Sequence, residues 1–251
     1  MRFFLEIAYR GTNYHGWQSQ PNAITIQEEI EKALALILKQ KTSLTGSGRT
    51  DTGVHANQQI AHFDSEEIDE IDERNLIFQL NSYLSRDIAV RSIKSVHPDA
   101  NARFSAISRT YHYHLHQEKD PFKQDLSYFF PTVLEVEKIK DACELIRSWQ
   151  NFECFSKVHT DVNHFDCDIL SIEWTRKHHR HLFSIKANRF LRGMVRAIVG
   201  TLLDVGLGRN SLQDLQLILE SRDRSRAGRS VPAHGLYLEE VTYPNETFLV
   251  Q

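Results

Sequence analysis

The chain has 251 residues, of which 41% are hydrophobic and 25% are charged, and its formal net charge at pH 7 is -3. This composition is ordinary for a globular protein with a buried core, and it excludes a disordered chain. No stretch approaches the roughly 18 apolar residues of a membrane span. The N-terminal run MRFFLEIAYRG lacks the long apolar core of a signal peptide, so we expect a cytoplasmic protein without membrane contact.

Cysteine spacing also limits the kinds of site. Cys143, Cys154 and Cys167 are odd in number, widely spaced and without a C-x-x-C pair. This pattern argues against a disulfide framework and against a zinc knuckle.

The first hundred residues show alternating strand and helix patterns. Thr25 followed by Glu28 is a capping-box signal, and apolar residues then recur at helical spacing. Runs of β-branched and aromatic residues predict the strands. In chain order we predict a strand over 2–9, a helix over 25–39, strands over 41–44 and 59–64, a helix over 73–84 and a strand over 87–96.

A similar order follows in the rest of the chain. We predict a strand over 109–117, a helix over 135–149, strands over 166–176 and 181–188, helices over 190–205 and 211–220, and a strand over 236–243. Both parts thus carry a ferredoxin-like order of elements. We predict an α+β fold of two ferredoxin-like (βαββαβ) halves, over 1–104 and 105–251, with a central antiparallel sheet and a catalytic cleft between the halves.

The most distinctive segment is GSGRTDTGVHA, residues 46–56. Its three glycines permit backbone conformations closed to other residues and let a ligand approach the main chain. The carboxylate of Asp51 in this loop can act as a nucleophile or base if a cation keeps it ionised, and Arg49 is the nearest candidate in sequence. The alternative is an aspartate that only hydrogen-bonds to its own turn.

Tyrosine and histidine alternate along the predicted strand RTYHYHL. Tyr111 and Tyr113 share one face, which suits stacking of nucleobases, and packing in the core is the alternative for Tyr113. The other face carries His112, His114 and His116. Because no acidic partner and no H-E-x-x-H pattern accompanies these histidines, we predict no metal site.

The helix that includes FLRGMVRAIVG carries arginines beside an apolar stripe. Arg192 and Arg196 are four residues apart and therefore lie on one face. An arginine in this position suits a bidentate partner such as a carboxylate, for which Asp51 is the candidate, and a plain surface residue is the alternative.

The sequence allows two roles for each of two polar loops. The loop GTNYHGWQSQP, residues 11–21, either clamps a backbone or connects a strand to a helix, and the sequence favours the connector. The arginine-rich loop ESRDRSRAGRS, residues 220–230, suits phosphate contacts or is simply solvated. Residues 64–73 hold seven acids, whereas residues 186–229 hold nine basic residues against four acidic ones, which permits a basic surface on a mildly acidic chain.

Taken together, these segments resemble the tRNA pseudouridine synthase A family over nearly the whole chain. The GRTD-x-GVHA segment is highly specific. Six segments in family order carry the resemblance: GTNYHGWQSQ (11–20), GSGRTDTGVHA (46–56), NSYLSRDIAV (81–90), ARFSAISRTYHYHL (102–115), FLRGMVRAIVG (190–200) and PAHGLYLEEVTY (232–243).

The resemblance implies an enzyme that isomerises uridine to pseudouridine at positions 38, 39 and 40 of the anticodon arm of tRNA, with base flipping and with neither cofactor nor metal. It implies that Asp51 is catalytic and that Arg49 intrudes into the RNA stem and holds the flipped nucleotide. It further implies that Tyr111 packs on the target base and that Arg196 pairs with the catalytic carboxylate. Family members are typically homodimers, with tRNA lying across both subunits.

The chain departs from the family pattern at four positions outside the implied catalytic set. Ser85 stands where proline is usual, and Arg10 stands where an aspartate often precedes the G-T pair. Asn151 and Cys154 stand where aspartate and serine are frequent.

Two other functions fit the sequence less fully. One is a non-catalytic tRNA-binding or folding module that uses the tyrosine-bearing strand and the basic loops. The other is a hydrolase that releases uracil, which requires a second carboxylate to activate water, and none is apparent near Asp51 in sequence.

Overall fold

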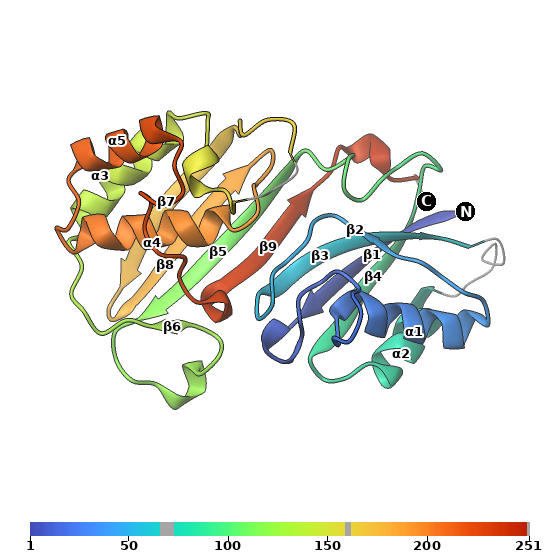
Figure 1. Ribbon diagram of the computed structural model, residues 1–251. Helices are drawn as coiled ribbons and strands as arrows, with labels where there is room; N and C mark the ends of the chain where they lie inside the picture. The colour runs from blue at the N-terminus through green and yellow to red at the C-terminus, as the bar shows by residue number, and fades with distance from the viewer. Residues whose placement is uncertain (66–72, 159–161, 250–251) are drawn as a thin grey trace. The chain divides into compact units, whose positions relative to one another are not determined.

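The computed structural model describes residues 1–65, 73–158 and 162–249, and these ranges contain five α-helices and nine β-strands (Figure 1). The α+β class is therefore confirmed. The chain forms two compact units, one of Met1–Ser108 with Tyr237–Gln251 and one of Arg109–Leu236. We call them unit 1 and unit 2.

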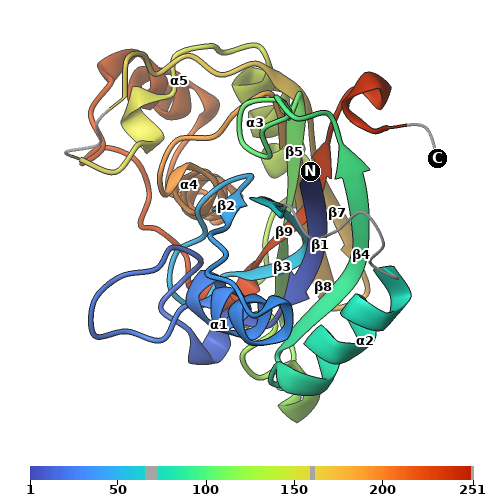
Figure 2. The ribbon, with the colours of Figure 1, turned by 90° about the vertical axis from the view of Figure 1, so that its right-hand side faces the viewer.

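Unit 1 is a sheet with two helices on one face (Figures 1 and 2). Its strand order is β4, β1, β3, β9, with the short β2 on β3. Strand β1 is antiparallel to both neighbours, whereas β9 is parallel to β3. The elements are β1 (Arg2–Tyr9), α1 (Ile26–Leu38), β2 (Thr45–Gly46), β3 (His55–Asp64), α2 (Glu73–Tyr83), β4 (Ile88–Val96) and β9 (Leu236–Thr242).

Local chemistry fixes the ends of α1. The hydroxyl of Thr25 accepts a hydrogen bond from the Glu28 N–H (3.4 Å), which satisfies a free helix-end donor. Lys39 closes the helix in the left-handed conformation (φ 53°). The apolar residues at helical spacing, Ile26, Ile30, Ala33 and Leu34, are all buried.

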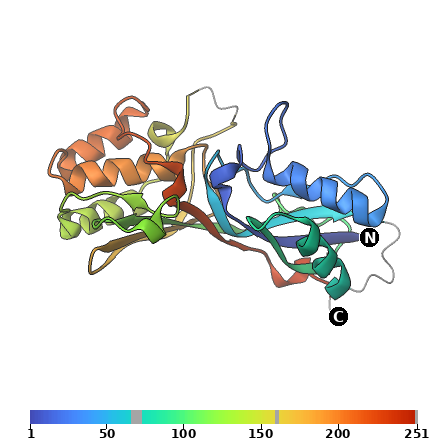
Figure 3. The same cartoon turned by 90° about the horizontal axis from the view of Figure 1, so that it is seen from below.

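Unit 2 is a sheet with three helices on one face (Figure 3). Strand β8 lies between β5 and β7 and is antiparallel to both, and β6 is parallel to β5. Helix α4 is the most buried of the three helices, with eleven buried residues. The elements are β5 (Ser108–His116), β6 (Tyr128–Phe129), α3 (Val136–Arg147), β7 (Ile169–Lys177), β8 (Arg180–Ala187), α4 (Met194–Gly206) and α5 (Leu212–Ser221).

Three expectations need correction. Residues 41–44 are not a strand, because the chain joins β3 only at Thr45–Gly46. Helix α4 begins at Met194 rather than at residue 190, since Gly193 precedes it with φ 75°. The sheet of unit 1 is mixed rather than antiparallel, because β9 joins β3 in parallel.

The observed division of the chain also differs from a boundary at residue 104. The last strand, which we expected to complete the second half, groups from Tyr237 onward with unit 1. Most of the acidic run, residues 66–72, lies outside the described residues.

Burial of His181 predicts a loss of stability in mild acid. The Trp174 Nε1–H donates to His181 Nδ1 (3.0 Å) in the core, where the imidazole is 2% exposed. Burial lowers the pKa of His181 from 6.5 to about 4. Between these values the unfolded chain binds a proton that the folded chain does not, so the free energy of unfolding falls as the pH falls from 6.5 toward 4, by at most about 3 kcal/mol.

Urea unfolding of wild type and His181→Gln at several pH values between 7 and 4.5 measures this loss. The variant should show a shallower fall. It should keep a residual slope, because burial also lowers the pKa values of His62, His116 and His234. His178→Asn, at the exposed tip of the same hairpin, is the matched control. Equal slopes in wild type and His181→Gln would contradict the assignment.

Candidate active site

The loop that carries Asp51 joins β2 to β3 in unit 1, and its first half is fixed to β3. The Ser47 N–H donates to the carbonyl of Ile60 (2.7 Å). The Ser47 hydroxyl donates to Gln59 Oε1 (2.5 Å), and Gln59 Nε2 donates in turn to the carbonyl of Gly48 (2.9 Å). Since Ser47 and Gln59 are both buried, these bonds hold the loop in one conformation.

The second half of the loop is held by the segment 9–17. The hydroxyls of Tyr9 and Thr50 are hydrogen-bonded to each other (2.8 Å). The Trp17 N–H donates to the carbonyl of Thr50 (3.2 Å), and the Gly53 N–H donates to the carbonyl of Tyr14 (3.4 Å). Asp51 therefore lies between two residues whose backbone groups are tied to this segment.

Glycine lets the two segments approach closely. A Cβ on Gly11 would lie 2.0 Å from the carbonyl oxygen of Val54, and one on Gly16 would lie 2.4 Å from that of Thr50. Gly16 also has φ 88°, which other residues rarely adopt. The loop 11–21, for which the sequence favoured a connector, is thus the support of the Asp51 loop.

Asp51 itself is half-buried, and Arg49 is exposed. The hydrogen bond that closes the turn runs from the Val54 N–H to the main-chain carbonyl of Asp51 (3.1 Å). The turn is therefore closed by a hydrogen bond between backbone groups.

Sequence reasoning missed His55, the first residue of β3. Its side chain is 1% exposed, and its Nδ1 accepts a hydrogen bond from the Gly11 N–H (3.0 Å). Its ring stacks on Tyr237 of β9, with 4.6 Å between centroids. Burial raises the pKa of Tyr237 to about 12, so this phenol stays neutral. The histidine of GVHA and the tyrosine of GLYLEE were the available signals.

Tyr111 and Arg196 lie in unit 2. Tyr111, on β5, is half-buried and its ring contacts Phe190 edge to face, with 5.0 Å between centroids. Arg196, on α4, is half-buried, and its Nε donates to the carbonyl of Val231 (2.7 Å). Arg192 is exposed and lies before Gly193, outside α4, so it does not share a helix face with Arg196 as we expected.

The four predicted site residues fall into two pairs. Asp51 and Arg49 share one loop of unit 1, and Tyr111 and Arg196 belong to unit 2. The pairing of Arg196 with Asp51 and the catalytic cleft remain predictions. Tyr113 is 0% exposed, which settles its alternatives in favour of core packing.

Two of the four departures from the family pattern, Ser85 and Asn151, form side-chain hydrogen bonds. The Ser85 hydroxyl is hydrogen-bonded to that of Tyr14 (2.7 Å), so the residue that replaces proline steadies the segment supporting the Asp51 loop. Asn151 accepts from the Glu153 N–H (3.2 Å) and donates to Asp166 (3.2 Å). Cys154 is buried, and the Arg10 side chain is exposed.

The histidines and cysteines show no arrangement for metal binding or thiol chemistry in the part of the chain that the structure describes. The described residues contain no group of three or more histidine, cysteine, aspartate or glutamate side chains placed to hold a metal ion. The ring of His116 is buried, and its Nδ1 is hydrogen-bonded to the Ser127 hydroxyl (3.0 Å). All three cysteines are free and buried, and burial raises the pKa of each thiol to about 12.

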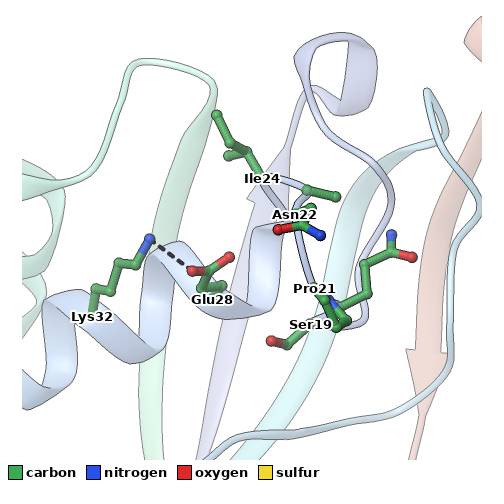
Figure 4. A pocket seen from close by; sticks show the side chains of 8 residues that line it. Ser19, Pro21, Asn22, Ile24, Glu28 and Lys32 are labelled. Atoms are coloured by element: carbon green, nitrogen blue, oxygen red, sulfur yellow. Dashed lines mark ion pairs between the residues drawn. The ribbon is translucent and has the colours of Figure 1, made fainter.

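A surface pocket of about 540 Å³ lies between residues 19–24 and the start of α1 (Figure 4). The ion pair of Lys32 with Glu28 (2.9 Å) lines it, and none of the four predicted site residues does. Of the helices in 1–65, 73–158 and 162–249, none has the length and apolar character to span a membrane.

The family profile and the similar proteins that match this chain carry the same description. The profile of a family described as tRNA pseudouridine synthase matches residues 7–105 and 149–244. A protein of Parabacteroides distasonis named tRNA pseudouridine synthase A is 47% identical over 253 residues, covering 100% of this chain and 99% of its own. Proteins of the same name from Porphyromonas gingivalis (47%, covering 99% of each chain) and Bacillus subtilis (38%, covering 98% of this chain and 100% of its own) are also similar.

Proposed function

Since the chain belongs to the tRNA pseudouridine synthase family, we propose that it converts uridine to pseudouridine at positions 38, 39 and 40 of the anticodon arm, with Asp51 as its catalytic residue. The chain is thus an isomerase that acts on tRNA, and the positions and residue roles are the proposal. A tRNA substrate implies that it works in the cytoplasm. The family resemblance adds a homodimer without cofactor or metal.

The observation that carries the proposal is the fixed position of the Asp51 loop. Hydrogen bonds hold this loop to β3 on one side and to segment 9–17 on the other. A carboxylate on such a support loses little freedom when the substrate arrives, which lowers the barrier of the chemical step.

Pseudouridine formation breaks the bond from C1′ to N1 of uridine, turns the uracil and rejoins it through C5. Departure of the base builds positive charge at C1′. An ionised Asp51 can add to C1′, stabilise that charge or remove a proton from C2′. Each of these steps requires the anionic carboxylate, which a neighbouring guanidinium favours. We assign that guanidinium to Arg196.

The target base must leave its stack before Asp51 can reach the sugar, at a cost of a few kcal/mol. Arg49 is exposed two residues before Asp51, and its planar group can fill the gap that the flipped base leaves. Tyr111 can pack on the flipped uracil and recover part of the cost.

The product formed by the purified chain tests this function. Incubated with a tRNA transcript that carries uridine at positions 38 to 40, the enzyme should form pseudouridine there and release no uracil. Free uracil would identify a hydrolase instead. Binding of the tRNA without any change in its nucleosides would identify a binding module.

Replacing Tyr111 separates ring packing from hydroxyl chemistry. Because an aromatic contact with a base contributes about 1 to 3 kcal/mol, Tyr111→Leu should lower kcat/KM by roughly 5- to 150-fold. Tyr111→Phe keeps the ring and should retain most activity. Single-turnover rates on one tRNA measure both variants, and an equal loss in the two would show that the hydroxyl, rather than packing, is what Tyr111 supplies.

A further inference from the structure

The side chain of Arg196 is fixed by a short segment without regular secondary structure, residues 228–232, which we call the strap. Arg196 Nε donates to the carbonyl of Val231 (2.7 Å), and the Val231 N–H donates back to the carbonyl of Arg196 (3.2 Å). A guanidinium is planar, so a bond at Nε fixes the direction of its whole donor edge. The position of Val231 therefore sets where Arg196 points.

The first part of the strap is fastened to α4. The Gly228 N–H donates to the Thr201 hydroxyl (2.8 Å), which donates to the carbonyl of Ala197 (2.9 Å). A Cβ on Gly200 would lie 1.8 Å from the carbonyl oxygen of Arg229, so the strap touches the helix backbone. Arg224 of the arginine-rich loop donates to the Gly228 carbonyl (3.1 Å) and to Ser230 Oγ (2.9 Å).

The last part of the strap is held by Tyr113. This residue of β5 is 0% exposed, and its hydroxyl donates to the carbonyl of Pro232 (2.8 Å), next to Val231. The ring is confined as well, because a Cβ on Gly235 would lie 2.6 Å from its Cζ. Burial raises the pKa of Tyr113, which keeps the phenol a neutral donor, and Arg196 is close enough to act in the opposite direction on that pKa.

We propose that Tyr113 is a positioning residue for Arg196, acting through the carbonyl of Pro232 and the strap. The proposal rests on the proposed function, in which Arg196 keeps the catalytic carboxylate ionised and oriented. It assigns a task to the second tyrosine of RTYHYHL and to the start of PAHGLYLEEVTY, which that function leaves without one.

Without the phenol, the Pro232 carbonyl loses its donor and the strap gains freedom at the residue beside Val231. A displacement of about 1 Å at a catalytic group is enough to cost about 10²-fold in rate, and a loosened support costs less than a displaced one. The loss belongs to the chemical step and not to tRNA binding, because Tyr113 is buried and cannot touch RNA.

The test is a double-mutant cycle of Tyr113→Phe and Arg196→Ala in the full chain, with kcat and KM measured for tRNA. We expect Tyr113→Phe to lower kcat about tenfold with KM unchanged, and to lower it no further in the Arg196→Ala background. Tyr128→Phe changes a half-buried tyrosine whose ring lies near that of Tyr113 and serves as the matched control. It should keep the wild-type kcat.

A wild-type kcat in Tyr113→Phe, or an equal loss in both backgrounds, would overturn the inference while leaving the proposed function in place. A wild-type kcat in Arg196→Ala would refute the role of Arg196 itself and, with it, the inference. If Tyr113→Phe does not fold, Thr201→Val loosens the strap at Gly228 instead and should show the same dependence on Arg196.

Discussion

Replacement of Asp51 by asparagine should abolish pseudouridine formation and leave the fold and tRNA binding intact. Asparagine has nearly the same shape but no charge, so it can neither add to C1′ nor stabilise positive charge there. We expect kcat to fall by at least about 10³-fold, which corresponds to about 4 kcal/mol of transition-state stabilisation.

Stability should change little in Asp51→Asn, because asparagine keeps the size of the side chain and the backbone hydrogen bond from the Val54 N–H to the carbonyl of residue 51. The measurements are single-turnover rates, tRNA affinity and thermal unfolding of the variant. Asp99→Asn removes an exposed carboxylate of unit 1 outside the loop and should match wild type in all three. Normal turnover by Asp51→Asn would remove Asp51 from the mechanism.

The second large effect is expected at Gly16, which has no proposed contact with the substrate. An alanine there would place its Cβ 2.4 Å from the Thr50 carbonyl oxygen, in a backbone conformation with φ 88°. Left-handed backbone costs a non-glycine residue about 1 to 3 kcal/mol, and the contact with Thr50 adds to this. We expect a loss of about 2 to 4 kcal/mol in the free energy of unfolding.

Gly16→Ala should also lower the activity of the fraction that remains folded, because the new Cβ would displace Thr50, the residue before Asp51. A displacement of about 1 Å would cost roughly 10²-fold in kcat. Chemical denaturation and kcat corrected for folded fraction measure the two effects separately. Gly48→Ala is the control for stability, since a Cβ on Gly48 meets nothing within 4 Å. Equal stability of the two variants would show that segment 9–17 does not hold the Asp51 loop.

The sequence predicted the helices well, since their signals are local. The capping residue Thr25 and the apolar spacing after it place α1 almost to the residue. The predicted start of α4 was wrong because the apolar run begins before Gly193, whose backbone cannot be inferred from hydrophobic spacing.

Long-range pairings could not be predicted in the same way. The residues of β9 predict a strand, but nothing in them indicates that this strand pairs with β3 in parallel. The support of the Asp51 loop was missed for the same reason. Tyr9, Gly16 and Trp17 lie more than thirty residues before Thr50, and only the folded chain shows that they hold it.

From the sequence, the candidate site could be predicted only as a set of reactive side chains, and their roles stay predictions. A glycine-rich segment with one carboxylate indicated Asp51, whereas the strap that holds Arg196 gives no sequence signal beyond one glycine and one proline. Supporting contacts of this kind use backbone groups, which every residue possesses and which no motif therefore displays.

The most direct test of the central claim is a map of pseudouridine in tRNA from cells that lack this protein, compared with cells that receive wild type or Asp51→Asn. We predict that pseudouridine at positions 38, 39 and 40 disappears in the deletion, returns with wild type and stays absent with Asp51→Asn. Loss at other positions only, or recovery with Asp51→Asn, would contradict the account.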